Sequence, residues 1–278
     1  MHRIKEYLRV TRLIFLEAKH PVHTLAYLKF KHPPYEITLK SGVKIVTKDL
    51  PFVLNKLMES YLKTNFGSSD RCEYNYNGTV YRINGFNSPA TIFSTFIYQD
   101  WRRLNVKNKY VLDIGGYIGD TAIYYAARGA KKIVAFEPFP YSFKVALDNV
   151  VQNNLQDVIE INNCSVGGED SYININPDYI NTNESFAVDQ LEGVKVPVIT
   201  LRSIVEKYQI DNWLLKMNCE GCEYEALART DIKTLRKFSE VLMHYHGDPQ
   251  PLVGKLREAG FKIRLDGFIY AKKDKIFS

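Results

Sequence analysis

The chain has 278 residues, of which 45% are hydrophobic and 24% are charged. These values are ordinary for a globular protein with a sizeable core and exclude an intrinsically disordered chain. No stretch approaches the ~20 apolar residues that a membrane span requires, and no signal-peptide pattern is visible, so we expect a cytoplasmic protein. In that compartment cysteines are reduced, which predicts free thiols at Cys72, Cys164, Cys219 and Cys222.

Basic residues are concentrated near the start of the chain. The formal net charge is +6, and residues 1–50 hold ten Lys and Arg against four Asp and Glu, so this segment carries the whole excess. A basic arm can attract nucleic acid, anionic lipid or sugar phosphates. The alternative is a solvated helix face, since these residues form no dense basic run.

The first hundred residues predict a small α+β extension (residues 1–100). Apolar positions at helical spacing predict a helix that ends near Pro21. Alternating apolar residues around Ser41-Gly42 and around Asn77-Gly78 predict two β-hairpins, within residues 35–46 and 73–86.

Residues 101–278 predict a second, α/β domain. Strands and helices alternate from Lys109 onward, which is typical of a parallel sheet with crossover helices. The polar residues 168–193 predict an irregular insertion that could act as a lid. A hairpin around Asp266-Gly267 makes the last strand antiparallel. We expect strands at 110–114, 132–137, 158–162, 213–218 and 240–245, and helices at about 119–128, 140–153, 200–208, 222–229 and 249–259.

A glycine-rich turn follows the first of these strands. Gly115, Gly116 and Gly119 let the backbone approach a ligand, and the helix that follows offers unpaired N–H groups. The turn is not a Gly-x-Gly-x-x-Gly dinucleotide motif. Asp113 and Asp120 suit the cationic end of S-adenosylmethionine and would repel a pyrophosphate. The turn therefore favours S-adenosylmethionine over a dinucleotide.

The ends of the next two strands extend this predicted cofactor site. Glu137 lies about twenty residues beyond the turn, where its carboxylate can accept both ribose hydroxyls. The alternative is a surface or helix-capping acid before Pro138. Asn163 and Cys164 end the third strand, where they would line an adenine pocket or be ordinary turn residues.

Several segments together resemble the FkbM family of class I methyltransferases. They are residues 111–121, 129–140, 165–167 and 215–223, and the resemblance spans about Tyr110–Phe261. It implies a Rossmann-like fold with a seven-stranded, mainly parallel sheet and an antiparallel C-terminal strand. It also implies S-adenosylmethionine as cofactor, with Tyr117, Thr121 and Pro138 in the cofactor segments, and O-methylation of sugars or natural-product scaffolds.

One residue departs from the family pattern. The family's Lys-Ile-Asp-Val-Glu-Gly segment has Asp where this chain has Asn218, beside the expected point of methyl transfer. Asn can position a hydroxyl but cannot accept its proton as a carboxylate would. Either proximity alone drives the reaction or another base serves. The candidate bases are Glu220, which we favour, Glu223, His244 and His246. Asn218, Glu220 and His244 form the predicted catalytic set, and Asn218 is also predicted to contact the cofactor.

The sequence is also compatible with three other functions. Cys219, Cys222, His244 and His246 could converge on zinc, but one Cys-x-x-Cys inside a longer motif is weak evidence, so no metal is predicted. The basic first fifty residues suggest nucleic-acid methylation instead of a small-molecule or glycan acceptor. Asn218 suggests a non-catalytic cofactor-binding protein.

Overall fold

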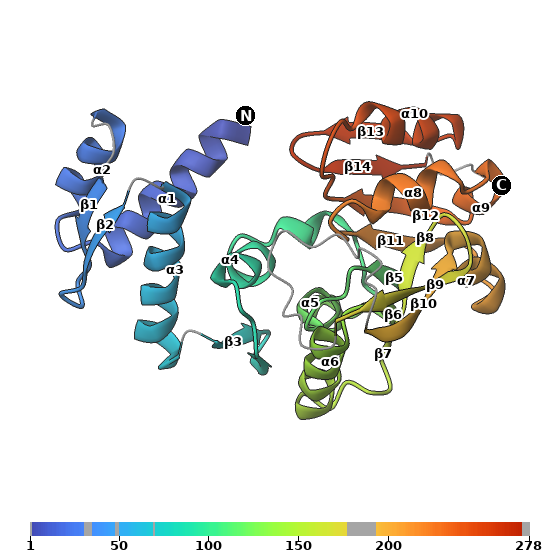
Figure 1. Ribbon diagram of the computed structural model, residues 1–278, viewed down its shortest axis with the longest axis horizontal. Helices are drawn as coiled ribbons and strands as arrows, with labels where there is room; N and C mark the ends of the chain where they lie inside the picture. Colours follow the sequence, from blue (N-terminus) through green and yellow to red (C-terminus); the bar gives the residue numbers. More distant parts are fainter. Residues whose placement is uncertain (1, 31–34, 48–49, 69, 177–192, 274–278) are drawn as a thin grey trace. The chain divides into compact units, whose positions relative to one another are not determined.

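The computed structural model describes residues 2–30, 35–47, 50–68, 70–176 and 193–273 (Figure 1). The chain forms two compact units. Unit 1 comprises Met1–Tyr74 and Ile83–Tyr98, and unit 2 comprises Asn75–Arg82 and Gln99–Ser278. Among the described residues, no helix has the length and apolar character needed to cross a membrane.

Unit 1 is an α+β structure, as predicted. The first helix ends before Pro21, and Pro21 then begins a second helix, a position where its missing N–H costs nothing. The hairpin around Ser41-Gly42 is confirmed, whereas the 17-residue helix α3 was not predicted. The elements are α1 (His2–Glu17), α2 (Pro21–Phe30), β1 (Tyr35–Thr38), β2 (Lys44–Thr47), α3 (Leu50–Phe66), α4 (Pro89–Ile92) and the π-helix η1 (Phe93–Ile97).

A second hairpin joins the two units in sequence. It pairs β3 (Arg71–Tyr76) with β4 (Thr79–Asn84), and its turn residues Asn77 and Gly78 both have positive φ, as a tight hairpin turn requires. The tip belongs to unit 2, where the backbone N–H of Arg82 donates to Asn153 Oδ1 over 2.8 Å.

Unit 2 is built on a seven-stranded sheet in the order β13-β14-β12-β11-β5-β6-β7. Every neighbouring pair is parallel except those of β14, which runs antiparallel to both β12 and β13. The predicted fold class is therefore confirmed. The strands are β5 (Tyr110–Ile114), β6 (Lys132–Phe136), β7 (Ile159–Asn162), β11 (Trp213–Met217), β12 (Phe238–Met243), β13 (Lys262–Leu265) and β14 (Ile269–Lys272).

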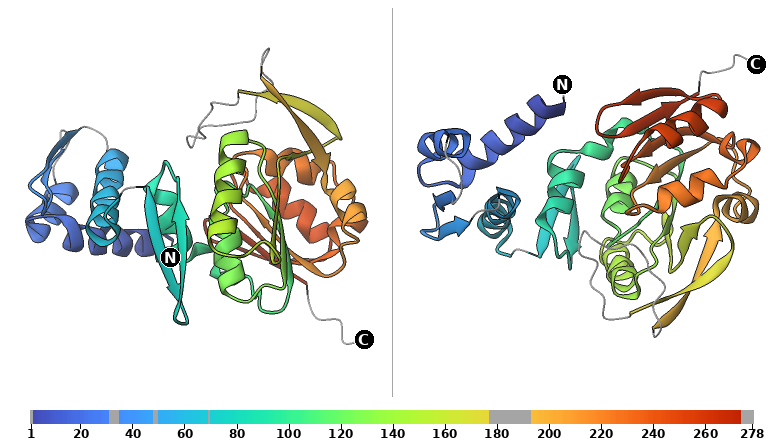
Figure 2. Two further views of the ribbon diagram at one scale, coloured as in Figure 1. Left: turned by 90° about the horizontal axis from the view of Figure 1, so that it is seen from below. Right: turned by 45° about the horizontal axis from the view of Figure 1, so that its top comes forward.

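Helices cover both faces of this sheet (Figure 2). On one face, buried strand residues such as Leu112, Leu215 and Val241 pack in a single cluster with helix residues such as Leu227 and Leu256. Because both faces are covered, the central strands β5 and β11 are mainly apolar on both faces rather than alternating, and Asp113 and Lys216 are the charged exceptions. The helices are η2 (Asp100–Arg103), α5 (Asp120–Ala127), α6 (Pro140–Gln152), α7 (Leu201–Lys207), α8 (Cys222–Ala228), α9 (Ile232–Leu235) and α10 (Gln250–Glu258).

A smaller sheet corrects one prediction. Its strands are β8 (Ser165–Gly167), β9 (Ser171–Ile175) and β10 (Val194–Thr200), in the order β8-β10-β9. The prediction of an irregular insertion over 168–193 is wrong for β9, which pairs antiparallel with β10. Its partner strand begins only after a long polar segment, so local patterning did not indicate the pairing. Residues 177–192 of the predicted lid lie outside the described residues.

A buried ion pair joins the two central strands. Asp113 on β5 is in register with Lys216 on β11, and Lys216 Nζ lies 2.8 Å from Asp113 Oδ1. Both side chains are almost completely buried. Lys216 also donates to the carbonyl of Gly115 over 2.7 Å, and Thr121 donates to Asp113 Oδ2 over 2.5 Å. The pair thus fixes the end of β5 to β11 and to the turn that follows β5.

Replacing Lys216 with Met should destabilise the fold. The variant leaves the Asp113 carboxylate buried without its cationic partner, which we expect to lower the free energy of unfolding by about 3–5 kcal/mol. Denaturant unfolding followed by circular dichroism measures this loss. The double variant with Asp113→Asn buries no charge and should recover part of it. A double variant no more stable than Lys216→Met would contradict the ion-pair account.

Candidate functional site

The glycine turn is held between two strand ends. Gly115 has φ +78°, and a Cβ there would lie 1.9 Å from the carbonyl oxygen of Asn218, so the position admits only glycine. The N–H groups of Gly115 and Gly116 both donate to the carbonyl of Phe136, at 3.0 and 2.9 Å. The turn is thereby fixed against the end of β6 on one side and the segment after β11 on the other.

Glu137 is buried beside this turn, so the alternative of a surface acid is wrong. Its Oε2 accepts from the backbone N–H of Tyr117 over 2.8 Å, and its Oε1 accepts from that of Phe139 over 3.0 Å. Burial raises the pKa of Glu137 to about 7 in spite of these donors. The buried carboxylate is held in one position and has no water to stabilise its negative charge. It is therefore suited to accept hydrogen bonds from a polar ligand.

The other predicted acids are engaged inside the protein. Both oxygens of Asp113 have partners, Lys216 and Thr121. Asp120 is buried in the first turn of α5, directly after Gly119, which has φ +80° and caps that helix. Asp113 and Thr121 therefore hold the turn in shape, a role that the sequence did not indicate because Lys216 is 103 residues away from Asp113.

A cavity of about 250 Å³ opens next to the turn. Of the predicted cofactor residues, Gly115, Pro138 and Cys164 line it. Asn163 stabilises the same wall, because its Nδ2 donates to the carbonyls of Glu137 and Pro138 at 3.0 and 2.9 Å. Burial raises the pKa of Cys164 to about 11, so this thiol is neutral. The volume is near the lower end for small-molecule pockets, which begin at roughly 300 Å³.

Asn218 and His244 meet where β11 and β12 end. The backbone N–H of His244 donates to the carbonyl of Met217 over 3.0 Å, which aligns the two strand ends. His244 Nδ1 lies 3.2 Å from Asn218 Oδ1 and 3.1 Å from His246 Nε2. Burial, followed by the charge of His246, lowers the pKa of His244. His244 is therefore a neutral imidazole at physiological pH.

His246 lies between two carboxylates. Its Nδ1 is 2.8 Å from Glu223 Oε1, and its Nε2 is 3.2 Å from Glu220 Oε2. Burial alone would lower the pKa of His246, but Glu220 and Glu223 raise it to about 9. Burial by itself would raise the pKa of Glu223, but the hydrogen bond from His246 lowers this pKa below its usual value. The structure thus joins the predicted catalytic residues Asn218, Glu220 and His244 through His246, with Glu223 behind them.

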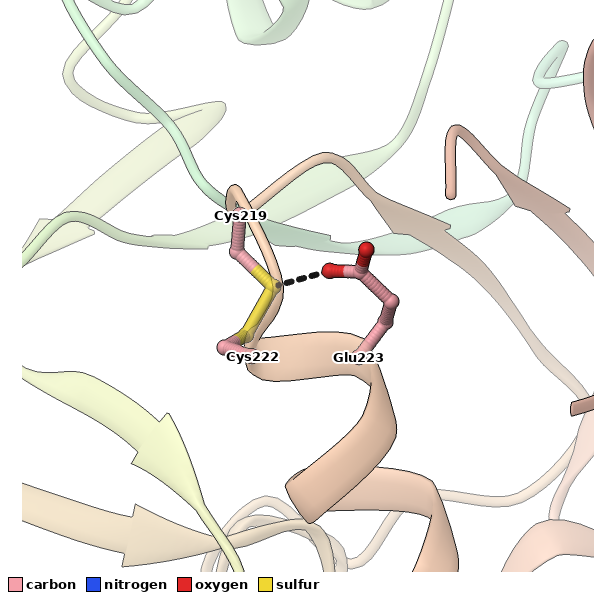
Figure 3. Close-up of side chains that lie close together, drawn as sticks. All are labelled: Cys219, Cys222 and Glu223. Carbon is pink, nitrogen blue, oxygen red and sulfur yellow. Dashed lines mark hydrogen bonds between the residues drawn. A yellow bond between two sulfur atoms is a disulfide. The ribbon is translucent and has the colours of Figure 1, made fainter. Parts of the chain in front are cut away.

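The prediction of four free thiols is wrong for one pair. Cys219 and Cys222 form a disulfide (Figure 3). Cys72 and Cys164 keep their thiol groups. Positive φ at Glu220 and Gly221 turns the chain so that the Cα atoms of the two cysteines are 5.4 Å apart, an ordinary disulfide separation. Within the described residues, these cysteines and Glu223 are the group whose ligand atoms could gather around a metal ion. With the sulfurs bonded to each other, they supply no thiolate.

The comparison with known families decides what kind of protein this is. The sequence profile of the methyltransferase FkbM domain matches residues 113–263, which is more than half of the chain. The chain belongs to the FkbM methyltransferase family. The resemblance inferred from the sequence is confirmed, and S-adenosylmethionine is the cofactor. The matched region contains the glycine turn, Glu137, the cavity and the Asn218–His246 cluster.

Individual relatives of this FkbM methyltransferase are distant. A protein from Methanocaldococcus jannaschii, described as a candidate protein N5-glutamine methyltransferase, is 38% identical over 126 residues. The match covers 41% of this chain and only 60% of that relative. The crystal structure of an FkbM methyltransferase from Methylobacillus flagellatus is 17% identical, with a TM-score of 0.45, covering 64% of this chain and 47% of that one. A methyltransferase structure from Streptococcus mutans is 9% identical, with a TM-score of 0.42, covering 73% and 55%.

Glu137 provides the test of the cofactor site. We expect Glu137→Ala to weaken binding of S-adenosylhomocysteine by about 10- to 100-fold, because hydrogen bonds to a charged group contribute about 1.5–3 kcal/mol. Calorimetric titration measures the affinity. Glu206→Ala, which removes an exposed carboxylate on α7, is the matched control and should bind like the unchanged protein. Equal affinities in all three proteins would contradict the assignment of Glu137.

Proposed function

We propose that this methyltransferase transfers the methyl group of S-adenosylmethionine to a hydroxyl oxygen of a sugar, glycan or small-molecule scaffold. The observation that carries the proposal is the neutral His244 beside Asn218, at the strand ends next to the glycine turn. Oxygen nucleophiles must lose a proton as they attack, and a neutral imidazole is the side chain best suited to accept it near pH 7.

Asn218 supports this role by fixing the tautomer of His244. The Oδ1 atom of Asn218 can only accept, so it favours the form of His244 that carries hydrogen on Nδ1. In this form the Nε2–H of His246, 3.1 Å from His244 Nδ1, donates to Glu220 Oε2 instead. The lone pair of His244 then resides on its Nε2, which is able to take up a proton. An aspartate at this position would raise the pKa of His244 and leave less of it unprotonated and able to accept a proton near pH 7. Asn218 thus suits His244 as the base, whereas the family's Asp suits a different one. Asn218 is therefore compatible with a catalytic protein.

The charged neighbours keep His244 in its basic form. His246 is an imidazolium at neutral pH, because Glu220 and Glu223 raise its pKa to about 9, and its charge disfavours a second proton on His244. In this proposal Glu220 holds His246 and borders the cavity, and His244 is the base. The sequence-based preference for Glu220 as the base is therefore replaced.

The remaining site residues are assigned to binding. When bound, the cofactor supplies a methyl group activated by its sulfonium charge. Glu137 would accept the ribose hydroxyls, while Pro138 and Cys164 would border the adenine. His244 Nε2 would take the proton of the acceptor hydroxyl as its oxygen attacks the methyl carbon. Holding the acceptor and the methyl group in line accounts for much of the expected acceleration.

The amide nitrogen of a protein glutamine is the second candidate acceptor. It is favoured by the archaeal relative described as a candidate protein N5-glutamine methyltransferase. An amide N–H is too weak an acid for an imidazole to deprotonate before attack, so this reaction needs hydrogen-bond acceptors and correct placement more than a base. Asn218 could provide such an acceptor. The two candidates therefore differ in how strongly the rate depends on His244.

His244→Gln separates the two acceptor classes. With an acceptor found by screening hydroxyl compounds and glutamine-containing peptides for a 14-dalton gain, we expect transfer to a hydroxyl to slow by about 10²–10⁴-fold in this variant. Binding of S-adenosylhomocysteine should stay within about two-fold, because His244 lies outside the predicted cofactor set. A glutamine peptide as the acceptor, or an unchanged rate in the variant, would overturn the proposal.

Asn218→Asp tests the tautomer argument independently. The added carboxylate should raise the pKa of His244, so the acidic limb of the pH–rate profile should move to higher pH. Activity should then be lost near pH 6–7 and largely recovered at higher pH, in contrast to the uniform loss in His244→Gln. A profile that keeps its shape and position would show that His244 is not the titrating base.

A further inference from the structure

The Cys219–Cys222 disulfide forms part of the wall of the cofactor cavity. All four residues from Cys219 to Cys222 line the cavity, together with Gly115, which contacts the backbone of Asn218 just before them. The bond therefore closes a short ring of chain directly at the surface that a bound cofactor would meet.

The ring has a backbone shape that needs support. Glu220 has φ +52° and Gly221 has φ +106°, so two successive residues occupy the left-handed region, and the first of them carries a side chain. Besides the disulfide, the ring is held by a 3.3 Å bond from the N–H of Cys222 to the carbonyl of Cys219 and a 3.0 Å bond from the N–H of Gly221 to Glu223 Oε2. Opening the disulfide removes the covalent restraint on this shape.

Cys219 and Cys222 are more accessible than the other two cysteines. Cys219 and Cys222 are partly exposed, whereas Cys72 and Cys164 are buried. Thiol–disulfide exchange requires access for the attacking thiolate. Cys164 borders the same cavity, but its thiol is neutral and is a poor competitor for the pair.

We propose that Cys219 and Cys222 are a reversible dithiol–disulfide site, reduced by dithiols of small molecules or proteins, whose oxidised form favours cofactor binding. In the exchange, a thiolate of the dithiol attacks one sulfur and breaks the Cys219–Cys222 bond, which forms a mixed disulfide. The second thiol of the reductant then displaces the protein sulfur. The reductant ends as a disulfide, and the protein gains two electrons and two protons as two thiols.

The disulfide should strengthen cofactor binding because it keeps the ring in one conformation. A disulfide that holds a loop in its ligand-binding shape lowers the entropy lost on binding, so the oxidised form should bind more tightly. Reduction also gives Cys219 a proton. The Cys219 sulfur lies 3.4 Å from Glu223 Oε2, so the new S–H can donate to the carboxylate that holds His246 (Figure 3). The redox state is thus connected to both the cavity wall and the histidine pair. The proposal rests on the family's cofactor and not on the proposed acceptor.

Calorimetric titration of the full chain with S-adenosylhomocysteine, before and after treatment with dithiothreitol, tests the proposal. Mass spectrometry after iodoacetamide labelling reports whether the bond is open. We expect the reduced, unlabelled protein to bind about five-fold more weakly or worse and to recover its affinity on reoxidation, while labelling of a separate sample shows that Cys219 and Cys222 are thiols. Cys222→Ser should bind like the reduced protein with or without dithiothreitol. Cys72→Ser, far from the ring in sequence, should keep the full redox response.

Three outcomes would overturn the proposal of a reversible dithiol–disulfide site. One is equal affinity in the two forms when labelling shows that the bond has opened. Another is resistance of the bond to dithiothreitol in the folded protein. The third is a reduced protein that takes up one zinc ion per chain and regains affinity with zinc alone, because the pair would then be a metal site with Glu223. The oxidised–reduced comparison uses the unchanged sequence, so it remains decisive even if Cys222→Ser folds poorly.

Discussion

The buried ion pair of Asp113 and Lys216 is the interaction on which the site depends. It joins β5 to β11 at the centre of the sheet, and the same ammonium group binds the carbonyl of Gly115. Gly115 in turn contacts the backbone of Asn218 so closely that no side chain fits. One interaction therefore sets the position of the glycine turn, the proposed cofactor site, relative to the end of β11, the proposed site of methyl transfer.

The buried acids of the site differ in what balances their charge. Asp113 is neutralised by Lys216, and Glu223 by the imidazolium of His246. Among the described residues, the hydrogen bonds to the Glu137 carboxylate come from two backbone N–H groups and not from a cation. Its ionised form is accordingly disfavoured in the ligand-free protein, and its pKa is about 7. This carboxylate has the most to gain from a ligand that brings its own hydrogen-bond donors.

The sequence predicted what local patterns determine. Strand-and-helix alternation located the sheet, and the spacing of Gly115 and Glu137 located the glycine turn and the buried carboxylate beside it, because these features lie close together in the chain. It did not predict that Asp113 faces Lys216 or that His246 faces Glu220 and Glu223, since these contacts depend on which strands become neighbours. The Cys219–Cys222 disulfide was missed for a different reason. A reducing compartment predicts thiols, whereas the positive φ values of Glu220 and Gly221, which bring the sulfurs together, are a property of the folded backbone.

Proton release on cofactor binding tests the central claim, that Glu137 is the anchor for the ribose. Donors on the ligand favour the ionised carboxylate, so binding near pH 7 should lower the pKa of Glu137 and release part of a proton. Titration with S-adenosylhomocysteine in two buffers of different ionisation enthalpy measures this release. The account predicts release by the unchanged protein and much less by Glu137→Gln. Binding with no proton release, or with the same release in both proteins, would contradict it.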